Sequence, residues 1–176
     1  MRITVSGLPG SGTTSLSRYL AQRHGFEMIS AGEVFRQLAR EHHMELAEFG
    51  SLAEEDSSYD KMIDARQKEI AKSKDNILVE GRLSGWMVPD ADLKIWLFAP
   101  IDCRIQRIAF RDQVVDENTA KQLTLEREKC EAGRYRSYYD IDINDLSVYH
   151  MVLNSGHWGV EGLGSIVDSA IAQLKS

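Results

Sequence analysis

The sequence predicts an α/β fold in which a parallel sheet carries helices on both faces. Two observations predict it: short apolar or β-branched runs alternate with longer helical patterns, and a glycine-rich turn separates the first run from the first helix. Parallel strands of this kind are joined by right-handed crossovers and bind ligands at their carboxyl ends. A length of 176 residues with 43% apolar content suits a single domain, and the sequence shows no internal repeat, low-complexity tract or linker.

The individual elements follow one another closely along the chain. Strands are expected at residues 2–6, 26–29, 76–81, 93–98 and 148–153. Helices are expected at residues 14–24, 31–41, 101–111, about 119–139 and 162–174. Gly25 is expected to end the first helix, and Ser30 with Glu33 has the spacing of a capping box at the start of the second.

Residues 44–73 form a charged stretch with a helical pattern, which we interpret as an insertion between strands. The residues expected on its polar face are Asp60, Asp64 and Lys68. The residues expected to point more toward the interior are Met62, Ile63, Ala65 and Ile70.

Residues 7–14 have the spacing of a Walker A phosphate loop between the first strand and the first helix. Its glycines let the chain turn tightly, so that backbone N–H groups point at phosphate oxygens, and the following helix adds its positive N-terminal end. Thr14 keeps the hydroxyl that binds Mg²⁺ in such loops, but Thr13 stands where the loop's lysine is expected. The residues expected to bind the phosphates are Gly7, Leu8, Pro9, Gly10, Ser11, Gly12, Thr13 and Thr14.

The missing lysine leaves two interpretations of this loop open. Phosphoryl transfer needs positioned positive charge rather than one particular cation, so arginines from elsewhere could do the work of the lysine. The alternative is an ordinary glycine-rich turn between a strand and a helix.

Three arginines are candidates for holding the phosphate of an acceptor. Arg36 lies in the second turn of a helix, Arg82 follows the third strand, and Arg66 lies in the insertion. A guanidinium can bind phosphate through two parallel hydrogen bonds. Glu80, at the carboxyl end of the third strand, could hold Mg²⁺ through water. The alternative for each is a solvated surface charge or a salt bridge.

Two basic helix faces are expected further along the chain. Arg104, Arg107 and Arg111 are spaced by three and four residues, so they lie along one side of a helix, and Arg127 and Arg134 share a face of the next helix. Two such faces beside a polar connector can close over migrating phosphates and exclude water, as a lid does. The alternative is ion pairing on solvated helices with Glu126, Glu128 and Glu131.

The chain is acidic, with a formal net charge of −6, which argues against nucleic acid or an anionic membrane surface as its main partner. Its two cysteines, Cys103 and Cys130, lack metal or disulfide spacing and fit a reducing compartment. The five histidines show no metal-ligand spacing. Neither an N-terminal signal nor a run of about 18 apolar residues is present, so we expect a cytoplasmic protein.

In these motifs the chain resembles the cytidylate kinases of the compact archaeal type, within the adenylate-kinase-like group of P-loop nucleoside monophosphate kinases. The resemblance covers nearly the whole length. Its most typical phrase is Pro-Asp-Ala-Asp-Leu-Lys-Ile at residues 89–95, ahead of Arg104 and Arg107. The other similar segments are residues 3–14, 30–33 with Arg36, 77–82 and 147–154.

The resemblance implies a P-loop NTPase-type sheet of five parallel strands, an acceptor-binding insertion at about residues 30–73 and a helical lid at about residues 107–134. It implies one nucleoside monophosphate kinase domain over residues 1–176, a monomer whose partners are small-molecule nucleotides. The implied reaction moves the γ-phosphate of ATP to CMP or dCMP with Mg²⁺. The residues implied to bind the acceptor are Ser30, Gly32, Arg36, Arg66, Gly81 and Arg82. Those implied to stabilise the charge in transit are Arg107, Arg111, Arg127 and Arg134, and those implied to hold Mg²⁺ are Thr14 and Glu80.

Two other functions stay open at this point. One is a different small P-loop kinase that acts on AMP, UMP or a non-nucleotide alcohol such as shikimate. The other is a nucleotide-binding switch that lost catalysis together with its lysine. Retention of Thr14, Glu80 and two arginine faces argues against the switch, because a protein that only binds nucleotide needs no lid.

Overall fold

The computed structural model describes residues 1–44, 48–49, 52, 56–113 and 116–174. Its centre is a sheet of five parallel strands in the order β2-β3-β1-β4-β5. The strands are β1 (Arg2–Gly7), β2 (Glu27–Ser30), β3 (Ile77–Glu80), β4 (Leu93–Phe98) and β5 (Met151–Asn154). The predicted sheet of five parallel strands is therefore confirmed, and every predicted strand overlaps an observed one.

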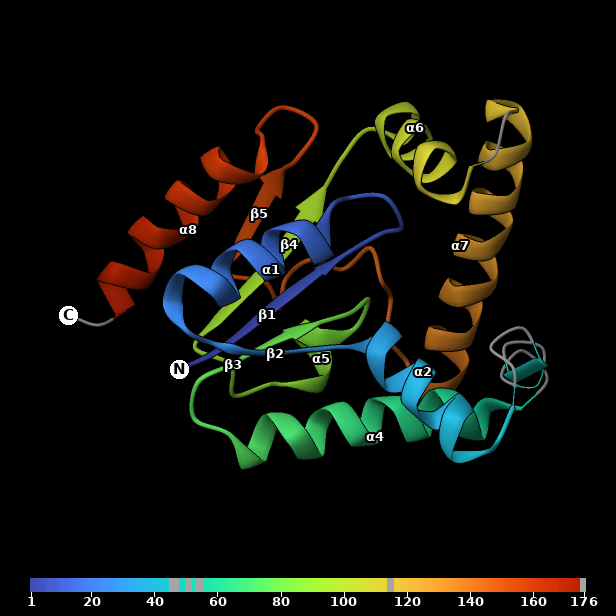
Figure 1. The fold of residues 1–176 in the computed structure, drawn as a ribbon, viewed down its shortest axis with the longest axis horizontal. Coiled ribbons are helices and arrows are strands. Elements are labelled where there is room, and N and C mark those ends of the chain that lie inside the picture. Colours follow the sequence, from blue (N-terminus) through green and yellow to red (C-terminus); the bar gives the residue numbers. More distant parts are fainter. Residues whose placement is uncertain (45–47, 50–51, 53–55, 114–115, 175–176) are drawn as a thin grey trace.

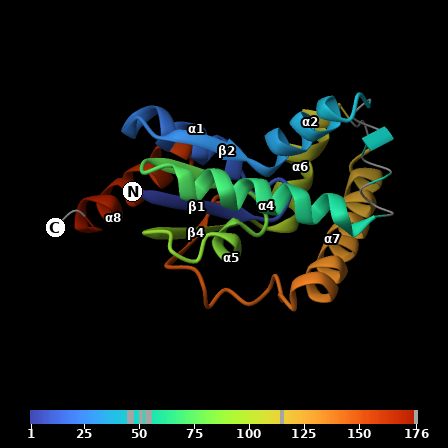
Figure 2. The ribbon, with the colours of Figure 1, turned by 90° about the horizontal axis from the view of Figure 1, so that it is seen from below.

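Helices cover both faces of the sheet, as predicted (Figures 1 and 2). One face is covered by α1 and α8, the other by the short α5 and the segment at 140–150, while α4 packs against β3 near the β2 end of the sheet. Beyond the carboxyl ends of the strands lie α2, α6 and α7 (Figure 1). The helices are α1 (Thr13–His24), α2 (Ala31–Glu41), α4 (Ser57–Ser73), α5 (Ser84–Met87), α6 (Ile101–Asp112), α7 (Glu117–Tyr139) and α8 (Val160–Leu174).

Burial on both faces explains why the central strands are nearly continuous apolar runs. On the face under α1 and α8, Ile3, Leu20 and Val167 are fully buried in one cluster. On the opposite face, Trp96 of β4 packs against Tyr149, with 5.2 Å between the ring centroids. Strands covered on both faces need apolar side chains at every position, so they lack the alternation of half-exposed strands.

Local sequence features fix both ends of the segment that leads to α2. Gly25 ends α1 in the left-handed conformation with φ of 68°. The capping box predicted at the start of α2 is confirmed: Ser30 Oγ accepts from the Glu33 N–H at 3.0 Å, and Glu33 Oε2 accepts from the Ser30 N–H at 3.3 Å. The start of α2 is therefore held beside the carboxyl end of β2.

Part of the prediction for α4 is wrong. Met62 and Ala65 are exposed, although the pattern placed them toward the interior, whereas Ile63 is buried as expected. Of the predicted polar face, Lys68 is exposed but Asp60 and Asp64 are half-buried beside α7.

Asp60 and Asp64 are half-buried because α7 covers a second side of α4. A helical period separates polar from apolar faces, but it cannot distinguish water from a polar partner helix. The predicted insertion at 44–73 also includes residues 45–47, 50–51 and 53–55, which lie outside the described residues.

Two further differences concern the segments on the face opposite α1. β5 begins at Met151 instead of the predicted 148, because the Tyr149 N–H donates to Leu146 O in a turn. The one-turn helix α5 is too short to give a periodic pattern and was not predicted. Its Gly85 lies so close to Tyr149 that an added Cβ would stand 2.3 Å from the ring.

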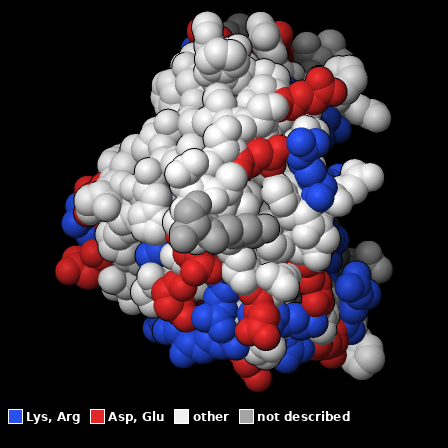
Figure 3. All heavy atoms as spheres, turned by 90° about the vertical axis from the view of Figure 1, so that its left-hand side faces the viewer, with Lys and Arg blue, Asp and Glu red and all other residues white. Residues whose placement is uncertain are grey.

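Charged side chains of both signs are mixed on the face that carries the N-terminus and α8. In Figure 3 they are densest in the lower part, with further acidic and basic side chains at the upper right. Two ion pairs near the N-terminal edge of the sheet join opposite charges, Lys74 with Glu27 at 2.6 Å and Arg2 with Asp90 at 2.7 Å. Within the described ranges no helix is long and apolar enough to cross a membrane.

Candidate active site

The loop at residues 7–14 connects β1 to α1 and has a backbone conformation that requires glycine. Gly10 and Gly12 adopt φ of 79° and 87°, and the Ser11 N–H donates to Leu8 O at 3.1 Å. A Cβ on Gly10 would stand 2.6 Å from Arg104 O, and a Cβ on Gly7 would stand 2.6 Å from Leu97 O. The chain therefore turns as tightly as a phosphate loop does, directly before the N-terminus of α1.

Two arginines of α6 brace this loop from behind. Arg104 is buried and donates to Pro9 O at 3.1 Å and Ala99 O at 3.2 Å, and it is paired with Glu128 of α7. Arg107 donates to Gly10 O at 3.2 Å and to both oxygens of Ser155. Their guanidinium groups thus hold carbonyls of the loop and keep its conformation.

Thr13, in the position of the expected lysine, is turned toward β3. Its Oγ1 donates to Glu80 Oε1 at 2.6 Å, and only 8% of the residue is exposed. Glu80 ends β3 in register with Val5 of β1, which brings its carboxylate next to the start of α1. Thr13 therefore ties the loop to the neighbouring strand and contributes no charge.

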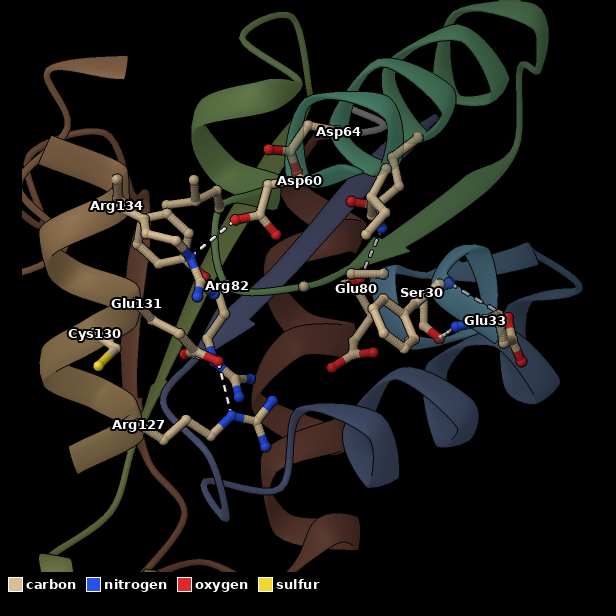
Figure 4. Close-up of a pocket in the computed structure, with 18 of the residues that line it drawn as sticks. Ser30, Glu33, Asp60, Asp64, Glu80, Arg82, Arg127, Cys130, Glu131 and Arg134 are labelled. Atoms are coloured by element: carbon tan, nitrogen blue, oxygen red, sulfur yellow. Dashed lines mark hydrogen bonds and ion pairs between the residues drawn. The ribbon is translucent and has the colours of Figure 1, made fainter. Parts of the chain in front are cut away.

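A cavity of about 1290 Å³ has Thr14 in its lining. Figure 4 shows other residues that line it. Its walls come from α1, α2, α4, the end of β3 and α7. The charged residues that line it are Arg18, Arg36, Arg82, Arg127 and Arg134 together with Glu33, Asp60, Asp64, Glu80, Glu126 and Glu131. A cavity this rich in arginines suits an anionic ligand of nucleotide size, and the many carboxylates mean that most of these cations already have a partner.

One cluster of charged side chains in the cavity wall consists of Glu131 and two arginines (Figure 4). Glu131 of α7 accepts from Arg82 Nε at 2.8 Å and from Arg127 Nε at 2.9 Å. Burial raises the pKa of the Glu131 carboxyl, but the two guanidinium groups outweigh burial and hold its pKa below the usual range. The cluster joins the end of β3 to α7 across the cavity.

A second group joins α4 to α7 at the other end of the cavity. Arg134 Nε lies 2.9 Å from Asp60 Oδ2, at an angle too poor for a hydrogen bond, and the Tyr139 hydroxyl donates to Asp64 Oδ2 at 2.6 Å. Burial raises the pKa of Asp60. Burial raises the pKa of Asp64 to about 6, against the hydrogen bond from Tyr139 and with help from the neighbouring Asp60.

The predicted site residues divide into those at the cavity and those outside it. The ones that line the cavity are Thr14, Ser30, Gly32, Arg36, Glu80, Gly81, Arg82, Arg127 and Arg134. Arg66 instead pairs with Glu41 at 2.9 Å on the surface, Arg107 holds the loop, and Arg111 pairs with Asp112. The alternative of ion pairing holds for Arg104 and Arg127, although neither pair lies on a fully solvated helix face.

Several lining residues escaped the sequence reasoning, chiefly Arg18, Gln67 and Tyr138. Arg18 had one available signal, because it follows Thr14 by four residues and so shares its side of α1. Gln67 is buried and donates to Glu80 O at 3.1 Å, a contact that no local pattern reveals.

Thr14 and Glu80 bring two oxygen donors to one place. Thr14 Oγ1 lies 3.5 Å from Glu80 Oε1. Hydroxyl and carboxylate oxygens are the donors that Mg²⁺ takes in proteins, usually together with water and substrate phosphates. Within the described part of the chain no group of three or more His, Cys, Asp or Glu could hold a metal by itself. The pair therefore fits an ion that arrives with a nucleotide.

The order of the strands, the glycine loop after β1 and the helical wall beyond it define the fold class of the small P-loop kinases. Within that class, the chain belongs to the cytidylate kinase-like family, whose sequence profile matches residues 2–157. It is 76% identical to a cytidylate kinase of Methanoregula boonei, over 99% of this chain and 96% of the relative. A cytidylate kinase of Methanosphaerula palustris is 64% identical over 99% of both chains.

Solved structures agree with the fold class. An uncharacterised protein from Eubacterium ventriosum superposes with a TM-score of 0.72 at 16% identity, over 98% of both chains. Shikimate kinase from Acinetobacter baumannii superposes with a TM-score of 0.65 at 17% identity, over 98% of this chain and 93% of that enzyme. At these identities the likeness concerns the fold alone.

Proposed function

We propose that this protein transfers the γ-phosphate of ATP to CMP or dCMP, giving ADP and CDP or dCDP. The observation that carries the proposal is a phosphate loop that opens, at Thr14, into a cavity with arginines on α1, α2, α7 and the end of β3. Such a cavity offers a place for a second phosphate opposite the first. The choice of cytidine rests on family membership and on relatives named cytidylate kinase at up to 76% identity.

The donor phosphates lie in the loop at 7–14 in this proposal, and the acceptor lies against the wall of α2, α4 and β3, within the acceptor region at about 30–73. The acceptor phosphate is held by Arg36 and Arg82, beside Ser30, Gly32 and Gly81, and Arg66 would have to leave its surface ion pair with Glu41 to reach it. An oxygen of that phosphate attacks the γ-phosphorus, and the bond from the γ-phosphorus to the bridging oxygen of ADP breaks.

Arginines of α6 and α7 stabilise the charge that develops during this step. Arg127 and Arg134 line the cavity. For Arg107 and Arg111 to reach the migrating phosphate, the lid at about 107–134 has to close over the cavity, which would also exclude water. Residues 114–115 of this lid lie outside the described residues.

Mg²⁺ would be held by Thr14, with Glu80 acting through water, and would neutralise phosphate charge during transfer. The contact of Glu80 Oε1 with the hydroxyls of Thr13 and Thr14 supports this assignment, because it brings the carboxylate to the start of α1. We further propose a cytoplasmic monomer that binds no nucleic acid. The free Cys103 and Cys130 support the reducing compartment, and the mixed charges on the face in Figure 3 argue against a nucleic-acid surface there.

An acceptor panel tests the function. ADP formation is measured by a coupled assay with ATP and Mg²⁺ and, in turn, CMP, dCMP, UMP, AMP, GMP and shikimate, with a reaction lacking acceptor as the blank. Turnover is expected to be fastest with CMP or dCMP. Turnover with no acceptor in the panel would leave only the nucleotide-binding switch, and a clear preference for AMP, UMP or shikimate would replace the acceptor.

A further inference from the structure

The side chain in the position of the lysine cannot supply the missing charge. Thr13 is neutral, and its hydroxyl is directed at Glu80 Oε1 at 2.6 Å. The residue is buried, with 8% of its surface exposed, so its side chain is not available to a ligand in the cavity. If the loop binds a triphosphate, another cation has to lie near Thr14.

Most of the cavity's arginines are already paired with acids. Arg82 and Arg127 share Glu131, and Arg134 lies beside Asp60. Each of these carboxylates offsets positive charge that a phosphate would otherwise meet. The three guanidinium groups are therefore parts of the cavity wall before any ligand arrives.

The arginines behind the loop are occupied as well. Arg104 is buried against Pro9 O and Glu128, and Arg107 donates to Gly10 O and Ser155. Neither side chain lines the cavity. To turn toward a ligand, each would have to give up hydrogen bonds that hold the loop.

Arg18 differs from all of these. It is exposed, lines the cavity, and makes no hydrogen bond or ion pair to any residue that the structure describes. The same is true of Arg36 on α2, which lies 3.5 Å from where a Cβ on Gly32 would stand. The two unpaired guanidinium groups of the cavity thus come from different helices.

The position of Arg18 on α1 favours the donor phosphates. It follows Thr14 by four residues, so both side chains lie on the same side of the helix. Side chains in a helix lean toward its N-terminus, so a long arginine at this position reaches back over the turn that holds Thr14. Arg36, in contrast, lies beside Gly32 on the helix that starts at the end of β2.

We propose that Arg18 is the cation that contacts the γ-phosphate of ATP in place of the missing lysine. This inference rests on the proposed function and deepens it. As the oxygen of the acceptor attacks the γ-phosphorus and the bond to the bridging oxygen breaks, the guanidinium keeps its protons and stabilises the negative charge on the phosphoryl oxygens. Glu80 stays bound to Thr13, and Arg36 is left for the acceptor phosphate.

The test compares Arg18→Ala and Arg18→Lys with Arg23→Ala, a matched control. Arg23 is on the same helix but pairs with Asp168 at 2.6 Å outside the cavity. Arg18→Ala is expected to lower kcat with ATP and CMP by about 100-fold, Arg18→Lys to retain part of it, and Arg23→Ala to stay near wild type. Adding Thr13→Lys to Arg18→Ala is expected to recover activity, because it returns a cation to the loop.

A binding measurement without acceptor separates this inference from the proposed function. Wild-type protein is expected to bind ATP more tightly than ADP by calorimetry, and Arg18→Ala is expected to lose that preference. If wild type does not phosphorylate CMP, the proposed function fails while the ATP preference still tests Arg18. An unchanged kcat and ATP preference in Arg18→Ala, or an increase in KM for CMP alone, would overturn the inference.

Discussion

The phosphate loop and the cavity wall differ in what holds them in place. The loop at residues 7–14 is fixed by its backbone, with positive φ at Gly10 and Gly12 and carbonyls held by two arginines from α6. The wall is fixed by side chains that meet across long sequence separations, such as Arg82 with Glu131 and Tyr139 with Asp64. The loop should therefore fail when its conformation changes, whereas the wall should respond to changes of charge and pH.

Gly10→Ala tests the loop and is expected to have the largest effect. The new methyl group would stand 2.6 Å from Arg104 O at a φ of 79°, so the loop has to move. A displacement of about 1 Å at a catalytic group can cost about 100-fold, and kcat/KM for ATP should fall by at least that factor. Gly159→Ala is the control, because Gly159 lies outside the cavity and no described atom lies within 4 Å of the added group. Activity within tenfold of wild type in Gly10→Ala would mean that the loop is not rigid.

Glu131→Ala tests the wall. It leaves Arg82 without its acid and should lower the free energy of unfolding by about 2 to 3 kcal/mol at pH 7, somewhat below the usual cost because Arg127 is largely exposed. The folded pKa of Glu131 is lowered, so this stabilisation is present above the unfolded pKa and is lost as the pH falls through the folded value. Urea unfolding at pH 7 and near pH 3 measures the loss of stability in the variant and its dependence on pH. Glu126→Ala, on the same helix and also at the cavity, should change little, and an equal loss in both variants would contradict the role of the cluster.

Asp64→Asn is expected to change the pH dependence of stability. The folded pKa of about 6 lies above the unfolded value of about 3.9, so the native state binds more protons in between and wild type loses stability as the pH rises. The loss amounts to about 2 kcal/mol between pH 4 and pH 7. Asparagine carries no proton to lose, so Asp64→Asn should gain stability relative to wild type over this range. Asp75→Asn, at an exposed position, should show no such trend, and parallel curves for Asp64→Asn and wild type would contradict the buried carboxyl.

Thr13→Val has the smallest expected effect, because it removes one hydrogen bond and keeps the shape of the side chain. Stability should fall by about 1 kcal/mol, since Glu80 loses its shortest donor. Thermal unfolding of Thr13→Val is compared with that of Thr4→Val as a control. The buried hydroxyl of Thr4 has no hydrogen-bond partner among the described residues, so the difference between the two variants reports the contact of Thr13 with Glu80. Equal stability of Thr13→Val and wild type would show that the hydrogen bond from Thr13 to Glu80 does not stabilise the fold.

The same contrast explains how much the sequence could predict. The first four strands, most helix ends, the capping box at Ser30 and the loop at 7–14 depend on neighbouring residues, and the structure has them within a residue or two of the expected positions. The wall depends on which helices meet in space. Arg82 and Glu131 are 49 positions apart, and no local pattern pairs them.

One incomplete prediction and one omission have the same physical origin. Asp60 and Asp64 were expected on the polar face of a helix, but periodicity cannot tell whether such a face meets water or a polar cavity. Arg18 was not singled out from the sequence, because its significance depends on the cavity around it and on the pairing of its neighbours. Residues in a wall of this kind can be recognised only when the positions of the helices are known.

We expect a phosphate loop with threonine in the lysine position still to transfer phosphate to CMP. Phosphorus NMR of the wild-type protein with ATP, Mg²⁺ and CMP tests it most directly, because the spectrum distinguishes transfer from hydrolysis. The expected result is that resonances of CDP and ADP grow together as those of ATP decline. Growth of ADP with inorganic phosphate and no CDP, or an unchanged spectrum, would contradict it.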